Sequence, residues 1–465
     1  MGRASGAHGP RHVSDQLRQL SDRSFTGLQR SAVLAAAASA NIAASFLYNW
    51  YLLAVLGPGR EVDALFAAMI APQLLLVVVG TALSNVLIPM LSVQPESRIP
   101  DLVWTMLRVV FLYTGLAALC LALTARWWVP LAVPGFPPDA RPLVVKLTAI
   151  QLVGAVLTVV SAVQRSAYNA RHRFVWPEAS TLLSTGLGFV YLAAAIPTQG
   201  VAAAAWATVV RAVLQVLFLL RGTGRYRRPR ERVAELRDAW VRLRPLMLGA
   251  LYFKTDFVVD RLLASMAPVG ALSLYSLAQQ AYSAAQLVLG KALAAPAVPP
   301  LSRAAETRRW GQFRSLSRRR LLMLVLMSLI GYVGVLLLGR PVLGLVFGHG
   351  KMTPAKLDEL WWLFVALGGV WFGSVAGQII AASFYAEGDT RTPMVVGAAT
   401  CTVAIGLKVA GFFAFGITGL AVAASLYYLS SASVQWIILE RRLRRRLIGP
   451  PVVAEGLTAA EAPPS

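Results

Sequence analysis

Twelve apolar runs, each long enough to cross a lipid bilayer, dominate the sequence and leave little choice of fold. An α-helix needs about 20 residues to span the hydrocarbon layer, and a backbone in lipid must satisfy its own hydrogen bonds. Only 14% of the 465 residues are charged and 57% are hydrophobic, so lipid must cover most of the surface. The sequence predicts an all-α integral membrane protein with about twelve transmembrane helices, near residues 31–56, 62–91, 101–124, 142–167, 174–196, 200–220, 243–267, 270–302, 321–347, 358–386, 392–414 and 418–439.

The net charge of +23 belongs to the connecting segments and not to a folded basic domain. A nucleic-acid-binding protein would gather basic residues on one face of a soluble domain, whereas here they lie between apolar runs. With the N-terminus in the cytoplasm, the inner segments hold 31 of the 44 lysines and arginines and the outer segments hold 7. Cytoplasmic loops carry such an excess. We therefore expect both termini in the cytoplasm and no nucleic-acid partner.

A stretch of the second span recurs in the eighth and predicts two matching halves. Residues 79–92 and 289–302 align without a gap, so that Gly80 and Gly290 lie 210 residues apart. A second match, offset by 216 residues, follows the fourth and tenth spans. Six crossings separate the copies, which gives both halves the same orientation, as in parallel repeats related by an axis along the membrane normal. We expect two pseudo-symmetric six-helix lobes around a central cavity.

A basic segment between the sixth and seventh spans marks the boundary between the two halves. It holds 9 basic residues, and we expect it to touch anionic lipid headgroups. The expected organisation is a cytoplasmic basic N-terminal segment at 1–30, an N-lobe at 31–220, a basic cytoplasmic linker at 221–244, a C-lobe at 245–440 and a cytoplasmic tail at 441–465.

Charged residues inside the spans are the first candidates for function, because a charge at mid-membrane is costly and needs a partner or a task. The seventh span carries four of them: Lys254, Asp256, Asp260 and Arg261. Lys254 and Arg261 share one helix face, and the i, i+4 pair Asp256 and Asp260 shares another. One interpretation is a cationic face for a phosphate group and a carboxylate pair for a coupling ion or a proton. The other is that these charges only neutralise one another or neighbouring helices.

Further polar residues of the spans extend both interpretations. Lys291 of the eighth span is the preferred additional anion ligand; the alternative is that its long stem reaches the inner surface. Gln280 and Gln286 are candidates for contacts with sugar hydroxyls, although hydrogen bonds between helices are at least as common. Arg211 and Lys408 belong to no charge cluster in the sequence. For each of these two we expect a structural ion pair.

Signals for enzymatic chemistry are missing from the sequence. No Gly-x-x-x-x-Gly-Lys-Ser/Thr loop occurs, so the chain has no ATPase of its own. The 4 histidines are scattered over tail and loops, and Cys120 and Cys401 are far apart. We expect neither a metal site nor a disulfide. The sequence thus favours a protein that is not an enzyme and that needs no cofactor.

A series of short motifs runs along the chain between about residues 30 and 440. They are Leu56-Gly-Pro-Gly-Arg-Glu-Val-Asp-Ala-Leu-Phe66, Ala71-Pro-Gln-Leu-Leu75, Val86-Leu-Ile-Pro-Met-Leu91, Pro134-Gly-Phe136, Arg173-Phe-Val-Trp-Pro177, Phe347-Gly-His-Gly-Lys351 and Phe384-Tyr-Ala-Glu-Gly-Asp-Thr-Arg-Thr-Pro393. In this order they resemble the MurJ/MviN family of lipid II flippases. The resemblance implies the multidrug/oligosaccharidyl-lipid/polysaccharide exporter fold. It also implies flipping of a polyprenyl-diphosphate-linked saccharide from the inner to the outer leaflet.

The chain departs from the family pattern where the family would place its diphosphate ligands. The family has arginines in the first and second spans, where this chain has Tyr48-Asn49 and Leu76-Val77, and it has a further arginine in the eighth span near the position of Gln280. Its twelve spans and the run Asp260-Arg-Leu-Leu263 are more similar to the related flippases of O-antigen and exopolysaccharide repeat units. We expect other cations to replace the missing arginines, namely Lys254, Arg261 and Lys291.

The leading hypothesis is a lipid-linked saccharide flippase of the bacterial cytoplasmic membrane that works by alternating access. Its substrate is a lipid II-like peptidoglycan precursor or a polysaccharide repeat unit, with the polyprenyl tail left in lipid. One alternative is a cation-coupled exporter of small amphiphiles that uses Asp256 and Asp260. Another is a non-transporting scaffold for cell-envelope assembly. The expected partners are the lipid-linked saccharide, membrane lipids and proteins of cell-envelope biosynthesis.

Overall fold

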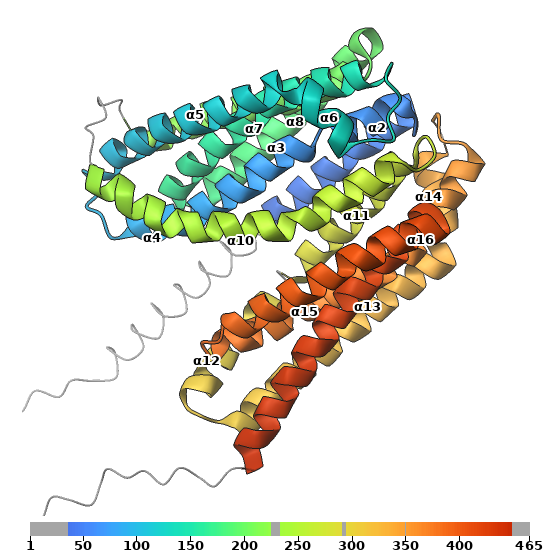
Figure 1. The fold of residues 1–465 in the computed structure, drawn as a ribbon. Helices are drawn as coiled ribbons and strands as arrows, with labels where there is room; N and C mark the ends of the chain where they lie inside the picture. Colours follow the sequence, from blue (N-terminus) through green and yellow to red (C-terminus); the bar gives the residue numbers. More distant parts are fainter. Residues whose placement is uncertain (1–35, 225–232, 291–293, 349, 449–465) are drawn as a thin grey trace, which may run out of the picture.

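The computed structural model describes residues 36–224, 233–290, 294–348 and 350–448, which are mainly helical and contain no strand (Figure 1). The expected N-terminal segment 1–30, most of the tail and Lys291 lie outside these residues. The elements are the helix Ala36–Leu56, α2 (Arg60–Ala67), α3 (Ile70–Leu75), the π-helix η1 (Leu76–Thr81), α4 (Ala82–Ser92), α5 (Ile99–Leu123), α6 (Ala125–Ala132), α7 (Arg141–Ala170), α8 (Val175–Gln199), α9 (Val201–Leu219), the 3-10 helix η2 (Leu220–Thr223), α10 (Val233–Ser265), α11 (Ala271–Leu289), the 3-10 helix η4 (Ala295–Ala297), α12 (Val298–Glu306), α13 (Trp310–Phe347), α14 (Pro354–Ala366), α15 (Gly368–Ala386) and α16 (Arg391–Ile448).

The crossings agree with the predicted twelve. Nine helices in the described part of the chain are long and apolar enough to cross a membrane. One of them, α16, leaves the helical conformation at Phe415 and Gly416 and so makes two crossings. The charged helix α10 and the interrupted stretch from α11 to α12 supply the remaining two. The expected all-α membrane fold is therefore confirmed.

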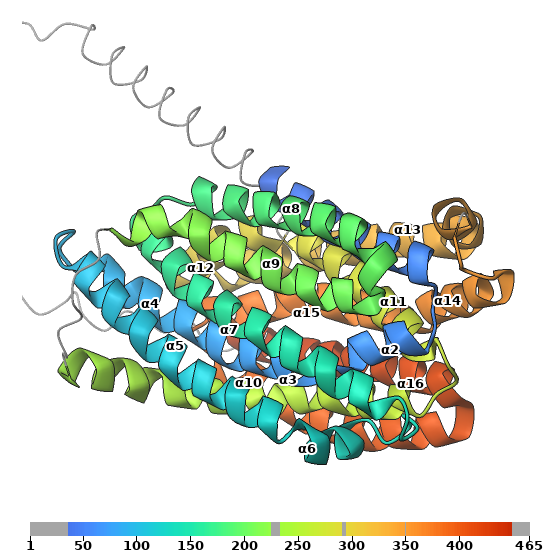
Figure 2. The same ribbon diagram turned by 90° about the horizontal axis from the view of Figure 1, so that it is seen from above.

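The outward faces of the helices are apolar and exposed, as a lipid-facing surface requires. On α5, Leu116 and Leu123 are 60% and 68% exposed, and on α13 Leu337 is 72% exposed. Within the N-lobe, α7 packs against α5 and α9, and α9 packs against α8 (Figure 2). The N-lobe is thus a helix bundle, and helices of both lobes present apolar side chains outward.

The turns between helices repeat with the spacing found in the sequence. Gly200 between α8 and α9 has φ 56° and ψ −136°, and Gly416 within α16 has φ 62° and ψ −143°. His172 and Gly388, after α7 and α15, have φ values of 57° and 79°. Both pairs are 216 residues apart. Positive φ at matched positions shows that the two lobes share a backbone plan.

The repeat around Gly80 and Gly290 coincides with the same helical irregularity in both lobes. Gly80 lies in the π-helix η1 of the second crossing. Gly290 and Ala294, on either side of residues 291–293, are also π-helical. Single-turn π segments often occur at functional sites. The sequence repeat therefore marks the places where the second and eighth crossings depart from a regular helix.

Helix α10 packs on both lobes. It contacts α16 of its own lobe, and it also lies along α3, η1 and α4 of the N-lobe. Its residue Ala239 is buried in the N-lobe cluster that contains Leu87 and Val103. The helix begins at Val233, inside the segment 221–244 that the sequence marks as a linker. Helix α10 therefore forms part of the contact between the two lobes.

The two lobes meet at one end of the molecule, and their helices diverge toward α4 and α12 at the other (Figure 1). At this closed end Asp63 of α2, which is only 6% exposed, accepts hydrogen bonds from two backbone N–H groups at the start of α11. The donors are Gly270 (2.6 Å) and Ser273 (2.8 Å). A carboxylate is favourable at a helix N-terminus. An N-lobe side chain thus holds the first turn of a C-lobe helix.

Further contacts at the closed end use backbone atoms of the C-lobe. The backbone N–H of Lys351 donates to the carbonyl oxygen of Ala54 at 3.0 Å. The indole N–H of Trp50 donates to the carbonyl oxygen of Val346 in α13. These contacts join the first crossing to α13 and to the loop after it, so the lobes are held together at this end by several hydrogen bonds.

Candidate substrate cavity

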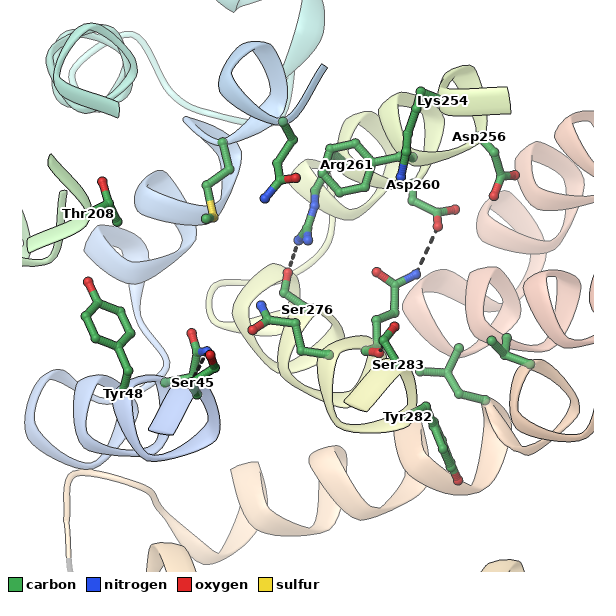
Figure 3. A pocket seen from close by; sticks show the side chains of 18 of the residues that line it. Ser45, Tyr48, Thr208, Lys254, Asp256, Asp260, Arg261, Ser276, Tyr282 and Ser283 are labelled. Carbon is green, nitrogen blue, oxygen red and sulfur yellow. Dashed lines mark hydrogen bonds between the residues drawn. The ribbon is translucent and has the colours of Figure 1, made fainter. Parts of the chain in front are cut away.

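A cavity of about 500 Å³ lies between the lobes and is lined by both (Figure 3). The N-lobe contributes residues of the helix Ala36–Leu56, α8 and α9, and the C-lobe contributes residues of α10, α11 and α16. Its polar and charged lining consists of Ser45, Tyr48, Asn49, Gln73, Thr185, Thr208, Arg211, Lys254, Asp256, Asp260, Arg261, Ser276, Gln279, Gln280, Tyr282, Ser283 and Tyr428. The predicted central cavity is therefore present, and polar and charged side chains from both lobes contribute to its lining.

Lys254 and Arg261 lie on the cavity side of α10, as their spacing indicates (Figure 3). Between them is Phe257, whose ring centroid is 5.7 Å from the Lys254 ammonium and 5.0 Å from the Arg261 guanidinium carbon. Both distances are within the range of cation–π attraction. The aromatic face stabilises the two cations and leaves their hydrogen-bond donors available.

The guanidinium of Arg261 is the most buried cation of the cavity wall, with 5% of the residue exposed. It donates a hydrogen bond to the hydroxyl of Ser276 on α11 (Figure 3), and its Nε–H has no partner among the residues that the structure describes. Among the described residues, no carboxylate oxygen lies within ion-pair distance of Arg261 or Lys254. A buried donor without a partner is costly, so Arg261 is suited to receive an anion.

The carboxylates of Asp256 and Asp260 are paired with Lys408 of α16. The Lys408 ammonium is 2.6 Å from an Asp256 oxygen and 2.7 Å from an Asp260 oxygen. The second oxygen of Asp260 accepts from the Gln279 amide at 3.0 Å and from the Tyr275 hydroxyl at 3.3 Å. The structural ion pair expected for Lys408 is confirmed.

Arg211 of α9 lines the N-lobe wall and makes no ion pair within the described residues. The structural ion pair expected for it is therefore wrong. The reason is that the described N-lobe wall of the cavity contains no acid, and the neighbours of Arg211 there are Tyr48, Gly188 and Thr208. Tyr48 donates its own hydroxyl proton to the carbonyl oxygen of Ala204. Arg211 is a cavity cation that sequence reasoning missed, and its mid-span position was the available signal.

The other predicted ligands, Gln280, Gln286 and Lys291, do not share one location. Gln280 lines the central cavity. Gln286 instead lines a second cavity between α11 and α15, where its backbone carbonyl oxygen accepts from the side-chain amide of Gln378 at 3.3 Å. Lys291 lies outside the described residues. Their roles as sugar or diphosphate ligands stay predictions.

Two of the positions that lack the expected arginines do face the cavity. Tyr48-Asn49 of the first crossing and Gln280 of α11 belong to its lining. Arg211, Lys254 and Arg261 line the same space from α9 and α10. The cavity thus keeps a set of cations, but on other helices than the family pattern would suggest.

Sequence comparison matches residues 52–456 to the family described as lipid II flippase MurJ. A probable lipid II flippase MurJ of Rhizobium meliloti is 24% identical over 406 residues, which cover 81% of this chain and 74% of that protein. The corresponding protein of Vibrio cholerae is 24% identical over 216 residues, covering 44% of this chain and 39% of the relative.

Structural comparison finds the same fold in a solved structure described as lipid II flippase MurJ in an inward closed conformation. The TM-score is 0.78 at 16% sequence identity, over 89% of this chain and 90% of the other. At this identity the match speaks for the fold alone, whereas the sequence match extends over most of the chain. The chain is a multi-pass membrane protein that belongs to the MurJ family, the family described as lipid II flippases.

Proposed function

We propose that this protein moves a polyprenyl-diphosphate-linked saccharide from the inner to the outer leaflet of the bacterial cytoplasmic membrane. Membership of the MurJ family supports a lipid-linked precursor as the substrate. The observation that carries the proposal is the set of three cavity cations, Arg211, Lys254 and Arg261, none of which is ion-paired within the described residues. Cations kept free of carboxylates in a membrane interior call for an anionic ligand.

A diphosphate suits these cations. Guanidinium groups bind phosphate oxygens through two parallel hydrogen bonds, and an ammonium adds a compact positive charge. Arg211 approaches from the N-lobe and Arg261 from the C-lobe, so a diphosphate between them would contact both lobes. The hydroxyl and amide groups of Ser45, Asn49 and Gln280 line the same cavity and can hydrogen-bond sugar hydroxyls.

The arrangement of the lobes supports transport by alternating access. The helices diverge toward the end that carries α4 and α12, and the connectors at that end contain Arg98, Arg171 and Arg308. Basic loops belong in the cytoplasm, so we place this end and both termini there. The substrate would enter from the inner leaflet, and its release would require the hydrogen bonds at the closed end to break.

The proposal is tested by translocation of a fluorescent polyprenyl-diphosphate saccharide in liposomes that contain the purified full-length protein. We expect translocation with the wild type and at least a tenfold lower rate with Arg211→Ala/Lys254→Ala/Arg261→Ala, because loss of charge-assisted hydrogen bonds costs about 1.5–3 kcal/mol each. Arg108→Ala is the matched control, since Arg108 is exposed on α5 and outside the cavity lining.

The choice of substrate separates the remaining hypotheses. Lipid II and a polyprenyl-diphosphate repeat unit are compared in parallel, with a polyprenyl monophosphate as the control for headgroup charge. Transport of the repeat unit but not of lipid II would assign the protein to polysaccharide export. An absence of transport for every diphosphate lipid, in wild-type protein shown to be folded, would contradict the flippase and favour the exporter or the scaffold.

A further inference from the structure

Lys408 is a buried cation whose only described charged partners are two carboxylates of another helix. Its side chain is 0% exposed, and its ammonium contacts Asp256 at 2.6 Å and Asp260 at 2.7 Å. It does not belong to the cavity lining, whereas both aspartates do. Lys408 therefore cannot act as a ligand of a substrate in this conformation. Lys408 can therefore influence substrate binding only through its contacts with the carboxylates of Asp256 and Asp260.

The two carboxylates are the natural competitors for the cavity cations. Asp260 is next to Arg261 in the sequence, and Asp256 is two residues from Lys254. Carboxylates released from Lys408 would lie on the same helical turns as these cations, in a partly water-excluded cavity where opposite charges attract strongly. Pairing would use up the donors that a phosphate needs.

Hydrogen bonds on the far side of Asp260 keep this carboxylate turned toward α11 and α16. One oxygen meets Lys408, and the other accepts from Gln279 and Tyr275. Arg261 is left with the Ser276 hydroxyl and an unpartnered Nε–H. The adjacent acid and base thus point to different partners, although each is the nearest opposite charge in the sequence.

The balance of charge shows what Lys408 contributes. On α10, two carboxylates oppose the two cations Lys254 and Arg261, so this helix segment is neutral by itself. The ammonium of Lys408 gives the C-lobe site an excess of one positive charge, and Arg211 adds a second from the N-lobe. Without Lys408, the described part of the cavity would keep only the charge of Arg211 to attract an anion.

We propose that Lys408 is a positioning residue that holds Asp256 and Asp260 away from Lys254 and Arg261 and thereby gives the cavity its affinity for a phosphate-bearing substrate. This inference rests on the proposed function, since it takes the cavity as the anion site. The lysine acts as a built-in counter-cation. A free metal cation at the carboxylate pair is then unnecessary, because the ammonium already occupies the position between the two aspartates.

The experiment measures binding of inorganic pyrophosphate to the full-length protein in detergent by isothermal titration calorimetry. Lys408→Met keeps the length of the side chain and removes its charge. We expect it to weaken pyrophosphate binding by at least tenfold. The matched variant Asp256→Asn/Asp260→Asn/Lys408→Met removes the whole network and leaves Lys254 and Arg261 without competitors. We expect this triple variant to bind within threefold of the wild type.

The triple variant separates positioning from a merely structural role, because a structural role predicts loss of binding in both variants. Binding by Lys408→Met at wild-type strength would overturn the inference, and so would tenfold weaker binding by a folded triple variant. If Lys408→Met does not fold, pyrophosphate binding by the triple variant alone tests the inference. Wild-type binding that survives Lys254→Ala/Arg261→Ala would instead overturn the anion site of the proposed function, and this inference with it.

Discussion

In the N-lobe the described cavity wall carries one cation, Arg211, among hydroxyl and amide groups, whereas the C-lobe wall carries Lys254 and Arg261 beside the buried network of Lys408. The backbones of the two lobes are nevertheless alike, with the same unusual turn at Gly200 and Gly416. The repeat therefore specifies where helices bend and end. The chemistry of the cavity depends on single side chains that the two lobes do not share.

The largest difference between the lobes should be in stability. We expect Lys408→Met to lower the free energy of unfolding by about 3–5 kcal/mol, because it removes the buried cation that pairs with both Asp256 and Asp260. Arg211→Met should change it by no more than about 1 kcal/mol, since no ion pair is broken. Thermal unfolding in detergent, followed by tryptophan fluorescence, measures both. Equal midpoints for the two variants would mean that the C-lobe network is not a stabilising one.

The next difference concerns anion binding by the two walls. We expect Arg211→Ala and Arg261→Ala each to weaken pyrophosphate binding by about 10–100-fold, from the loss of a charge-assisted hydrogen bond worth about 1.5–3 kcal/mol. Thr208→Ala, on the same wall as Arg211, serves as the control. Calorimetric titration gives the affinities. If only Arg261→Ala weakens binding, the anion site belongs to the C-lobe alone.

At the closed end, the side chain of Asp63 in the N-lobe caps a helix of the C-lobe. Asp63→Ala should shift the conformational equilibrium by about 1–2 kcal/mol toward separation of the lobes there, the usual value of such a cap. Spin labels at Asp139→Cys and Ala355→Cys measure the distance between the two lobes by electron paramagnetic resonance. Cys120→Ala removes the exposed native cysteine, which would otherwise be labelled. Ser265→Ala is the control, because its contact with the Gly135 N–H is long at 3.4 Å. An unchanged distance distribution would show that Asp63 does not hold the lobes together at this end.

The turns after α7 and α15 offer a smaller test of the shared backbone. His172 has a φ of 57° and Gly388 a φ of 79°. A side chain in this conformation costs about 1 kcal/mol. We expect His172→Gly to raise stability and Gly388→Ala to lower it, each by about that amount, as shifts of opposite sign in the unfolding midpoint. Shifts of the same sign would contradict the equivalence of the two turns.

The turn after α15 should also respond to pH, through a carboxylate that the N-lobe turn lacks. Burial raises the pKa of Glu387 despite the nearby Arg446. Hydrogen bonds from Thr392 and Arg442 hold the pKa of Asp389 well below its usual value. The contribution of Glu387 to stability is therefore present below its unfolded pKa of about 4.3 and is lost as the pH rises through the folded value.

Two variants test these pH dependences, and their thermal unfolding midpoints are measured at pH 8 and pH 5. Glu387→Gln should be more stable than the wild type at pH 8, and the gain should shrink toward pH 5. Asp389→Asn should be less stable at both values, because the contribution of Asp389 is lost only below its unfolded pKa of about 3.9. A pH-independent gain for Glu387→Gln would show that Glu387 does not titrate in this range.

The sequence predicted the site as far as local geometry extends. The spacing of Lys254 and Arg261 placed both on the cavity face of α10, and the apolar runs and the repeat predicted the lobes. It could not pair Lys408 with acids about 150 residues away, because that contact depends on how α10 and α16 pack. It also gave Arg211 an ion pair that the N-lobe wall has no acid to form. Sequence periodicity assigns residues to one face of a helix, but the packing of the helices determines which residues that face contacts.

The closed end has a consequence for genetics. Asp63 and Trp50 reach across to main-chain atoms of Gly270 and Val346, and Lys351 uses its own backbone N–H. Most side-chain replacements in the C-lobe keep these partners. The exceptions are proline at an amide donor and any side chain at Gly270, where φ is 90° and an added Cβ would lie 2.7 Å from the carbonyl oxygen of Pro58. A selection for variants that open too readily should therefore find substitutions mainly in the N-lobe. In the C-lobe, the expected sites are Gly270 and Gly350, where an added Cβ would press against backbone atoms of Pro58 and Ala54.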